Sequence, residues 1–137
     1  MALFSAGARY GLRACLLLAE RSTEGPLPGA AIAQRLRIPP QYLPVLLHRL
    51  KSAGIVATTR GQHGGYRLAR APASITVLDV LQAVDGRLAV VPEGGDGNDT
   101  AERLFAHLEG RLREELALSL TDAARRWGAD AVPMFQI

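Results

Sequence analysis

The chain of 137 residues contains a single cysteine, Cys15. One thiol cannot form a disulfide framework within the chain, so the small disulfide-stabilised secreted class is excluded. A low cysteine content is typical of proteins that work in a reducing compartment. We therefore expect a cytoplasmic location.

Long hydrophobic runs are also missing. The longest candidate is ACLLLA at residues 14–19, whereas a membrane-spanning helix needs roughly 20 apolar residues. The N-terminus lacks a charged segment followed by an apolar stretch and a small-residue cleavage site. These features predict no membrane partner and no secretion leader.

Catalytic motifs are absent from the sequence. It contains no nucleophile elbow, phosphate-loop glycine pattern, HExxH or CxxC. Asp79 and Asp85 are six residues apart and would lie roughly on opposite sides of a helix, so they are not a catalytic pair. We expect that the protein is not an enzyme.

Lysine is scarce, and arginine supplies 15 of the 16 cations. Residues 1–91 carry a balance of +7, whereas residues 92–137 carry −4. Arginine suits phosphate groups and guanine edges because its guanidinium is a planar fork of donors. The basic front half therefore indicates a module that faces a polyanion.

Apolar residues make up 48% of the chain, enough for a core, and the length fits one domain or one domain with an appendage. Helical periodicity runs from 5 to 22, with a stripe of apolar side chains at three- and four-residue steps. The stripe consists of Phe4, Ala8, Leu12, Cys15, Leu16 and Ala19. Two prolines and two glycines in 23–29 then interrupt the helix, and a short second helix fits 30–36.

Pro39 and Pro40 make a second break before a helix over 41–53, which Gly54 ends. Its inward face consists of Leu43, Leu46, Leu47 and Leu50, and its outward face includes Gln41, Val45, His48, Arg49 and Lys51. Two helices joined by about four turn residues, the second with cations outside, have the outline of a helix-turn-helix.

A β-hairpin is predicted next, with strands at 55–59 and 65–70 joined by RGQHGG. So short a loop needs positive φ angles, which glycine adopts without steric cost. Arg60, Arg67 and Arg70 would project from this ribbon beside the helix-turn-helix. The arrangement predicts a winged helix.

The remaining chain predicts three further helices. Thr76 and Asp79 form a capping-box pattern at the start of a helix over 75–86. Residues 87–100 are rich in glycine, aspartate, asparagine and proline, which is typical of a flexible linker. A long amphipathic helix follows over 101–118, and SLTD at 119–122 begins a short one that reaches Trp127.

Three stretches carry a resemblance to a known family: ARYGLRACLLLA, IAQRLRIPPQYLPVLLHRLKSAGIV, and RGQHGGYRLARAPASITVLDVLQAVDG. The match that they mark extends over about residues 5–86. They resemble the bacterial Rrf-type (BadM-like) winged helix-turn-helix regulators, a family that includes the iron–sulfur cluster regulator, the nitric-oxide-sensing repressor and the cysteine-metabolism repressor.

The resemblance implies a homodimer whose long helices cross. It also implies that helix 41–53 enters the major groove of a palindromic operator while the wing reaches the minor groove. Sensors of the family usually place three cysteines in the linker, with a carboxylate or histidine in the first helix as a further ligand. Here 87–100 has no cysteine and Glu20 is the first acid, so we expect no iron–sulfur cluster, no other cofactor and no metal site.

The expected DNA contacts come from three places. They are Ser5 and Arg9 at the first helix; Gln41, Tyr42, Val45, His48, Arg49 and Lys51 on the recognition helix; and Arg60, Gly61, His63, Gly64, Gly65 and Arg67 on the wing. Arg49 and Lys51 are assigned to phosphates. Pro44 departs from the family pattern, which often has an acidic or amide base-reader there, so the usual base preference does not carry over.

Several of these residues also have a plain structural interpretation. Arg9 and the wing arginines fit solvated surface cations, His63 fits a spectator, and Tyr42 fits a packed tyrosine. Cys15 fits a buried structural cysteine better than a redox switch. His107 fits a solvated or interface histidine, and Trp127 and Phe135 fit either the core or the dimer seam.

The expected fold is mainly α with a small β-hairpin wing, a winged helix-turn-helix followed by a long C-terminal dimerisation helix. The expected division is a DNA-binding domain at 1–86, a linker at 87–100, and a dimerisation helix with a short helix at 101–137. The dimer face would consist of Leu104, Phe105, Leu108, Leu112 and Leu116. The expected function is sequence-specific DNA binding by a homodimeric repressor; the alternative is a module of the same fold that binds a protein or small-molecule effector, with DNA binding weak or lost.

Overall fold

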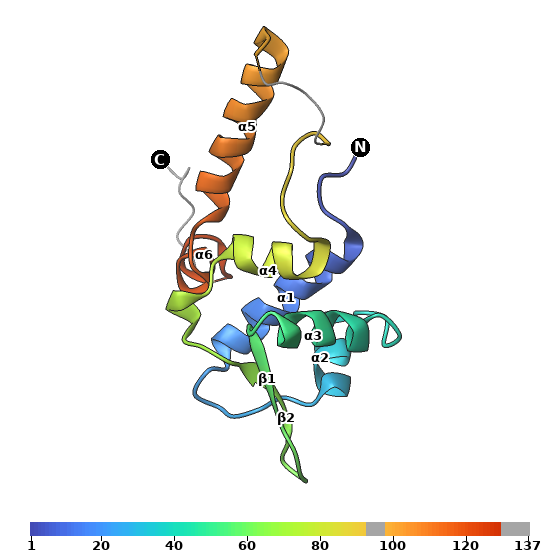
Figure 1. Cartoon of the computed structure of the whole chain (residues 1–137). Coiled ribbons are helices and arrows are strands. Elements are labelled where there is room, and N and C mark those ends of the chain that lie inside the picture. The colour runs from blue at the N-terminus through green and yellow to red at the C-terminus, as the bar shows by residue number, and fades with distance from the viewer. Residues whose placement is uncertain (93–97, 130–137) are drawn as a thin grey trace.

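The computed structural model describes residues 1–92 and 98–129, which form a helical body with a protruding hairpin and a long protruding helix (Figure 1). The elements in chain order are α1 (Ala6–Glu20), α2 (Gly29–Leu36), α3 (Leu43–Ser52), β1 (Val56–Thr59), β2 (Gly65–Leu68), the short 3-10 helix η1 (Pro72–Ser74), α4 (Val77–Asp85), α5 (Thr100–Leu116) and α6 (Leu120–Trp127). The predicted mainly α fold with one hairpin is confirmed.

Helix α1 lies at the centre of the body. It begins where the Ser5 hydroxyl accepts a hydrogen bond from the main-chain N–H of Ala8. Its packing surface contains two glycines, and a Cβ added at either would lie 3.0 Å from Leu46 at Gly7 or from Val84 at Gly11. These small residues let α1 pack closely against both α3 and α4.

The helix-turn-helix consists of α2, α3 and the turn at 37–42. Arg37 adopts a left-handed conformation with φ of 54°, and Ile38 is buried beneath the turn. Helix α3 begins at Leu43, two residues later than expected. Pro44 lies in its first turn, where the N–H that proline lacks would have no helical partner.

The wing comprises β1, β2 and their loop, residues 56–68. The two strands pair antiparallel, with Val56 opposite Leu68 and Thr59 opposite Gly65. Leu27 adds a pairing that the sequence did not predict, since its N–H donates to the Tyr66 carbonyl at 2.9 Å and its carbonyl accepts from Tyr66 at 2.8 Å. The base of the wing is therefore anchored to the segment before α2.

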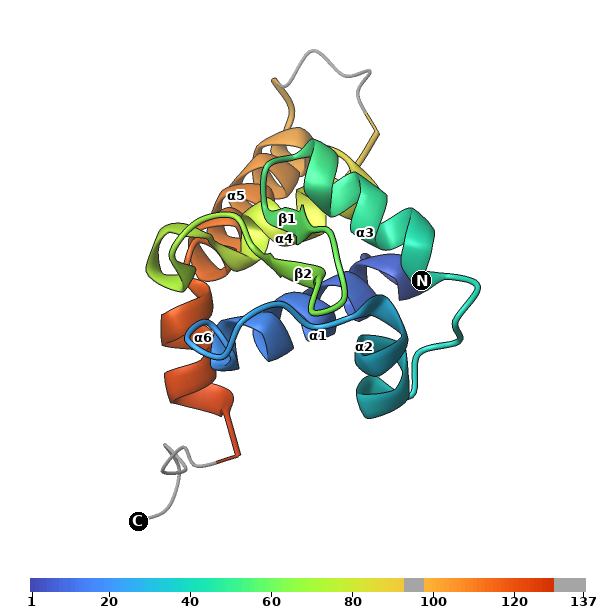
Figure 2. The same cartoon turned by 90° about the horizontal axis from the view of Figure 1, so that it is seen from below.

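Seen from below, the wing points out of the body, with α2 and α3 on one side and α6 on the other (Figure 2).

The predicted capping box of α4 is present, with Thr76 and Asp79 exchanging hydrogen bonds at 3.0 Å. Gly54 follows α3 with the expected positive φ of 75°.

Helix α6 packs into the main core. Leu120 is fully buried in that core. The Val77 N–H donates to the Leu118 carbonyl, and the Leu120 N–H donates to the Ile75 carbonyl, both at 2.9 Å. Trp127 is 67% exposed, so it does not complete the core of this chain; Phe135 lies outside the described residues.

The first part of the expected linker contacts the body. The Leu88 N–H donates to the Gln82 side chain at 3.0 Å, and the Val90 N–H donates to the Glu109 side chain at 3.1 Å. Arg113 donates to both the Leu88 carbonyl and the Gln82 side chain. These bonds hold residues 88–90 between α4 and α5.

Candidate nucleic-acid interface

Helix α3 presents one exposed face beside a fully buried one. Its four leucines are buried, as the spacing predicted. The exposed residues of α3 and the turn before it include Gln41, Tyr42, Pro44, Val45, His48, Arg49 and Lys51. Tyr42 and Val45 are each 55% exposed, so this face offers apolar as well as polar groups to a partner.

Two of these side chains also contact the body. The ring of Tyr42 lies 6.4 Å from that of Tyr10, at an interplanar angle of 32°. Arg49 donates to the Val84 carbonyl at 2.8 Å, which ties α3 to the last turn of α4. Tyr42 and Arg49 both line a hollow of about 320 Å³ between α1 and α3. Arg49 therefore has a structural role beside its predicted contact with phosphate.

The N-terminus of α1 already holds a carboxylate. The main-chain N–H of Ser5 donates to Asp85 at 2.9 Å, and the Ser5 hydroxyl donates to the other oxygen of the same carboxylate. A phosphate bound to Ser5 would have to displace Asp85. Arg9 is exposed on the next turn.

The glycine pair of the wing loop is explained by the hairpin itself. Gly61 and Gly65 have positive φ angles of 110° and 153°, whereas Gly64 does not. A Cβ at Gly64 would lie 2.1 Å from the Thr59 carbonyl oxygen, and one at Gly65 would lie 2.5 Å from the Leu27 carbonyl. Both glycines are needed for backbone packing.

The exposed side chains of the wing loop are those of Arg60, Gln62 and His63. Arg67 follows on β2, but the strand alternates, so its side chain and that of Tyr66 leave opposite faces of the ribbon. Tyr66 faces α2 and α3, where its ring lies near Gly29. Arg67 is thus placed on the side of the wing away from α3.

Arg70 does not project freely, contrary to the prediction. It donates to the Ser74 carbonyl at 3.2 Å and lies 4.0 Å from the Asp79 carboxylate. Together with Arg21 and Arg67 it lines a hollow of about 260 Å³ at the base of the wing. This grouping was missed because Arg21 lies at the end of α1 and no sequence pattern links it to the wing.

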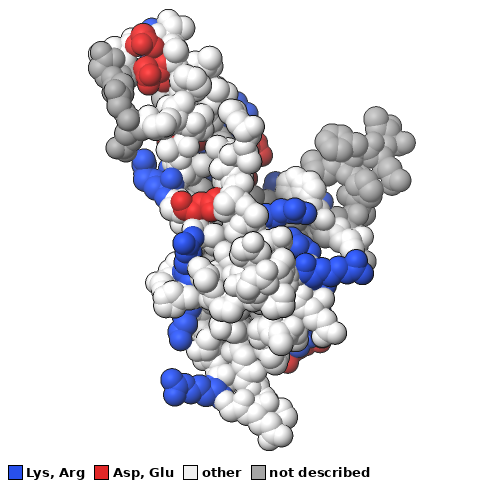
Figure 3. All heavy atoms as spheres, turned by 90° about the vertical axis from the view of Figure 1, so that its right-hand side faces the viewer, with Lys and Arg blue, Asp and Glu red and all other residues white. Residues whose placement is uncertain are grey.

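Figure 3 shows basic side chains spread over the lower part of one face, down to the wing, and acidic side chains at the upper end where α5 begins. This distribution agrees with the basic balance of residues 1–91. The winged part of the molecule therefore carries the net positive charge.

Helix α5 presents an uncovered apolar stripe. None of its residues is buried, and Leu104, Phe105 and Leu108 are 54%, 36% and 45% exposed. Leu112 is half-buried, and Leu116 packs partly against the chain's own core. The predicted dimer face is thus exposed to solvent from Leu104 to Leu108.

Cys15 is fully buried in α1, and burial raises its pKa to about 12. In residues 1–92 and 98–129, no three His, Cys, Asp or Glu side chains gather as a metal site. None of the helices described is long and apolar enough to cross a membrane.

Comparison with known proteins identifies relatives over most of the chain. The Rrf2 family, described as an iron-dependent transcriptional regulator, matches residues 4–124. The regulator CymR of Bacillus subtilis is 32% identical over 117 residues, which are 85% of each chain. The regulator IscR of Erwinia tasmaniensis is 41% identical over 109 residues, 79% of this chain but 66% of that protein, so this chain spans just under two thirds of that relative.

A solved structure, that of CymR, the global cysteine regulator of B. subtilis, superposes with a TM-score of 0.81 at 33% identity. It covers 90% of this chain and 97% of the other. The family description mentions iron. A cluster requires about four thiolate or comparable ligands, whereas the sequence has one cysteine, and that one is buried.

Proposed function

The chain belongs to the Rrf2 family of transcriptional regulators, and we propose that it acts as a homodimeric repressor that binds a palindromic DNA operator in the cytoplasm. The family consists of regulators and not of enzymes. The observation that carries the proposal is the exposed face of α3, where polar and apolar groups stand side by side on a rigid helix anchored by four buried leucines.

Base reading is assigned to the N-terminal turns of α3, the part of a recognition helix that contacts base edges. Gln41 and His48 offer hydrogen-bonding groups, and Val45 offers an apolar surface for a thymine methyl group. Pro44 has no N–H and no side-chain acceptor. The base opposite it would therefore be distinguished by shape alone.

Phosphate binding is assigned to cations around this face: Lys51 and Arg49 on α3, Arg9 on α1, and Arg60 at the wing. His63 and the main chain at Gly61 and Gly64 extend the surface toward the minor groove. Such contacts release counterions, so binding weakens steeply with salt. They position the protein on the duplex but carry no sequence information.

Dimerisation is assigned to the apolar stripe of α5. Leu104, Phe105 and Leu108 are too exposed for a helix that has no partner. A second copy of the same stripe would cover them and set two α3 helices at a fixed spacing, which matches a palindrome. We further propose that the dimer works without an iron–sulfur cluster, since the chain lacks the thiolates for one.

Fluorescence anisotropy with genomic fragments and random duplexes tests the proposal. With three to five phosphate contacts per protomer, we expect the logarithm of affinity to fall against the logarithm of salt with a slope of roughly −5 to −9 for the dimer. One class of fragments should bind at least about a thousandfold more tightly than random duplex. A slope near zero, or equal affinity for all duplexes, would contradict it.

The second candidate is a module that retains the fold and binds a protein or small-molecule effector. Pro44 on the exposed face of α3 favours it, because a base-reading position is occupied by a residue that cannot hydrogen-bond. Under this alternative, random duplex would bind at micromolar or weaker affinity even at low salt, and no genomic fragment would bind better.

A further inference from the structure

A hollow lined by arginines lies between the end of α1 and the base of the wing, and we propose that it binds a small free oxyanion of the phosphate class. Its volume is about 260 Å³. The residues that line it include three arginines, Arg21, Arg67 and Arg70, together with Ser22. No carboxylate lines it, so the polar side chains of the hollow favour an anion.

Arg21 provides the strongest reason to expect a ligand. Its side chain is only 19% exposed, and its Nε is buried without a hydrogen-bond partner among the described residues. The nearest acid is Glu24, whose Oε2 lies 3.5 Å from Nη1 of Arg21. Burying a cation is costly, and an oxyanion in the hollow would lower that cost by placing a negative charge beside the guanidinium; the buried Nε itself is out of reach of such an ion.

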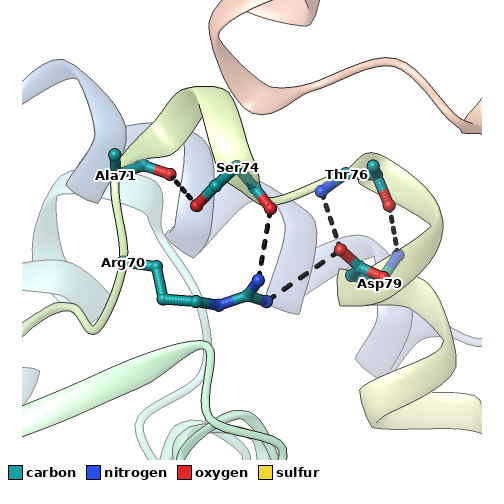
Figure 4. A network of polar contacts seen from close by, with 5 residues as sticks. All are labelled: Arg70, Ala71, Ser74, Thr76 and Asp79. Carbon is teal, nitrogen blue, oxygen red and sulfur yellow. Dashed lines mark hydrogen bonds and ion pairs between the residues drawn. The ribbon is translucent and has the colours of Figure 1, made fainter.

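Arg70 and Arg67 hold only long contacts with the protein. Figure 4 shows Arg70 reaching toward the Ser74 carbonyl at 3.2 Å and toward Asp79, which is 4.0 Å away and is already engaged with Thr76. Arg67 donates to the Leu68 carbonyl at 3.3 Å. Because a guanidinium has five N–H donors, each of these arginines retains donors for an anion.

A free ion fits this hollow better than a duplex phosphate does. Arg67 leaves the face of the ribbon opposite Tyr66, and Tyr66 faces α2 and α3. The hollow therefore lies on the other side of the wing from the base-reading face. A stiff duplex that follows α3 cannot also descend to the recessed Arg21, whereas a phosphate or sulfate ion can enter. The inference concerns ligand binding alone and does not depend on the proposed DNA binding.

Isothermal titration calorimetry of the full chain with inorganic phosphate, without DNA and with chloride to hold ionic strength constant, tests the site. We expect saturable binding of one phosphate per chain, with sulfate competing. Arg67→Gln and Arg70→Gln should each weaken it at least tenfold. Arg35→Gln, which removes an exposed arginine of α2 outside the hollow, should leave it unchanged.

Arg21→Gln is expected to abolish phosphate binding, and its thermal unfolding and circular dichroism show whether it is folded. If Arg21→Gln is not folded, the Arg67→Gln and Arg70→Gln variants still test the site. Binding that never saturates, or that Arg35→Gln weakens as much as the other variants do, would overturn the site. The site is also overturned if phosphate does not bind while Arg67→Gln and Arg70→Gln flatten the salt dependence of DNA binding, because the hollow would then hold a duplex phosphate. If the unmodified chain binds phosphate but no DNA fragment, the result counts against the proposed function alone.

Discussion

The carboxylate of Asp85, at the end of α4, accepts hydrogen bonds from both the main-chain N–H and the hydroxyl of Ser5, at the start of α1. It thereby places a negative charge at the N-terminus of α1, where the helix dipole favours one. Ser5 also accepts from the N–H of Ala8. The two residues thus link the start of α1 to the end of α4.

Replacing Asp85 by alanine should lower the free energy of unfolding by about 1 kcal/mol, since a capping bond on an exposed helix end is lost. Urea unfolding of Asp85→Ala, Ser5→Ala and the double variant measures the coupling between the two side chains. Glu20→Ala, at the exposed other end of α1, serves as the control and should change little. Additive effects of Asp85→Ala and Ser5→Ala would show that the bond contributes nothing.

The wing glycines should differ in their tolerance to alanine. At Gly65 a Cβ would collide with the Leu27 main chain at 2.5 Å, whereas at Gly61 nothing lies within 4 Å and only the positive φ opposes substitution. We expect Gly61→Ala to cost about 1 kcal/mol and Gly65→Ala to cost clearly more and separate the wing from residue 27. Thermal unfolding of the two variants tests the order, and equal costs would contradict the close approach.

Local sequence signals were enough to predict most of the fold. The leucines of α3, the capping box at Thr76 and the glycine after α3 are local signals, and the structure has each of them. The pairing of residue 27 with β2 and the placement of α6 in the main core were not predicted. They depend on contacts between segments far apart in the chain, which no local pattern encodes.

Charge is harder to place from sequence than apolar periodicity. Arg60, Arg67 and Arg70 look equivalent in the sequence, yet Arg60 is an exposed loop residue while the other two line a hollow with Arg21. The partners of a long side chain depend on which groups the folded backbone brings within its reach. The predicted DNA contacts on α3 lie on one exposed face. Ser5 and Arg67, and Arg49 within α3, also hold hydrogen-bond partners in the protein.

The stripe on α5 should govern the oligomeric state. Leu108→Glu places a charge in the middle of the proposed seam, where a second copy would have to desolvate it. We expect this variant to be monomeric by analytical ultracentrifugation at micromolar concentration, while the unmodified chain is a dimer. Ala106→Glu adds the same charge at another exposed position of α5, roughly opposite the stripe, and should remain a dimer. A dimeric Leu108→Glu would place the interface elsewhere.

Two residues of α3 should separate base reading from phosphate binding. Lys51→Ala should weaken binding to operator and random duplex alike and reduce the magnitude of the salt slope by about 1 per protomer. His48→Ala should cost about 1–3 kcal/mol on the operator and little on random duplex. Anisotropy titrations at several salt concentrations measure both effects. The assignment fails if His48→Ala weakens both duplexes equally.

Burial of Cys15 should make stability depend on pH in the alkaline range. Because the folded-state pKa is raised from 9.0 to about 12, the unfolded chain loses the thiol proton first and binds fewer protons between these values, so stability falls as pH rises. It is unaffected by Cys15 below pH 9. Cys15→Ala should remove up to about 1.4 kcal/mol per pH unit of that decline, although the cavity it leaves lowers stability at every pH. Urea unfolding of both proteins from pH 8 to 10.5 measures the difference in slope, and parallel curves would mean that Cys15 ionises in the folded chain as readily as in the unfolded one.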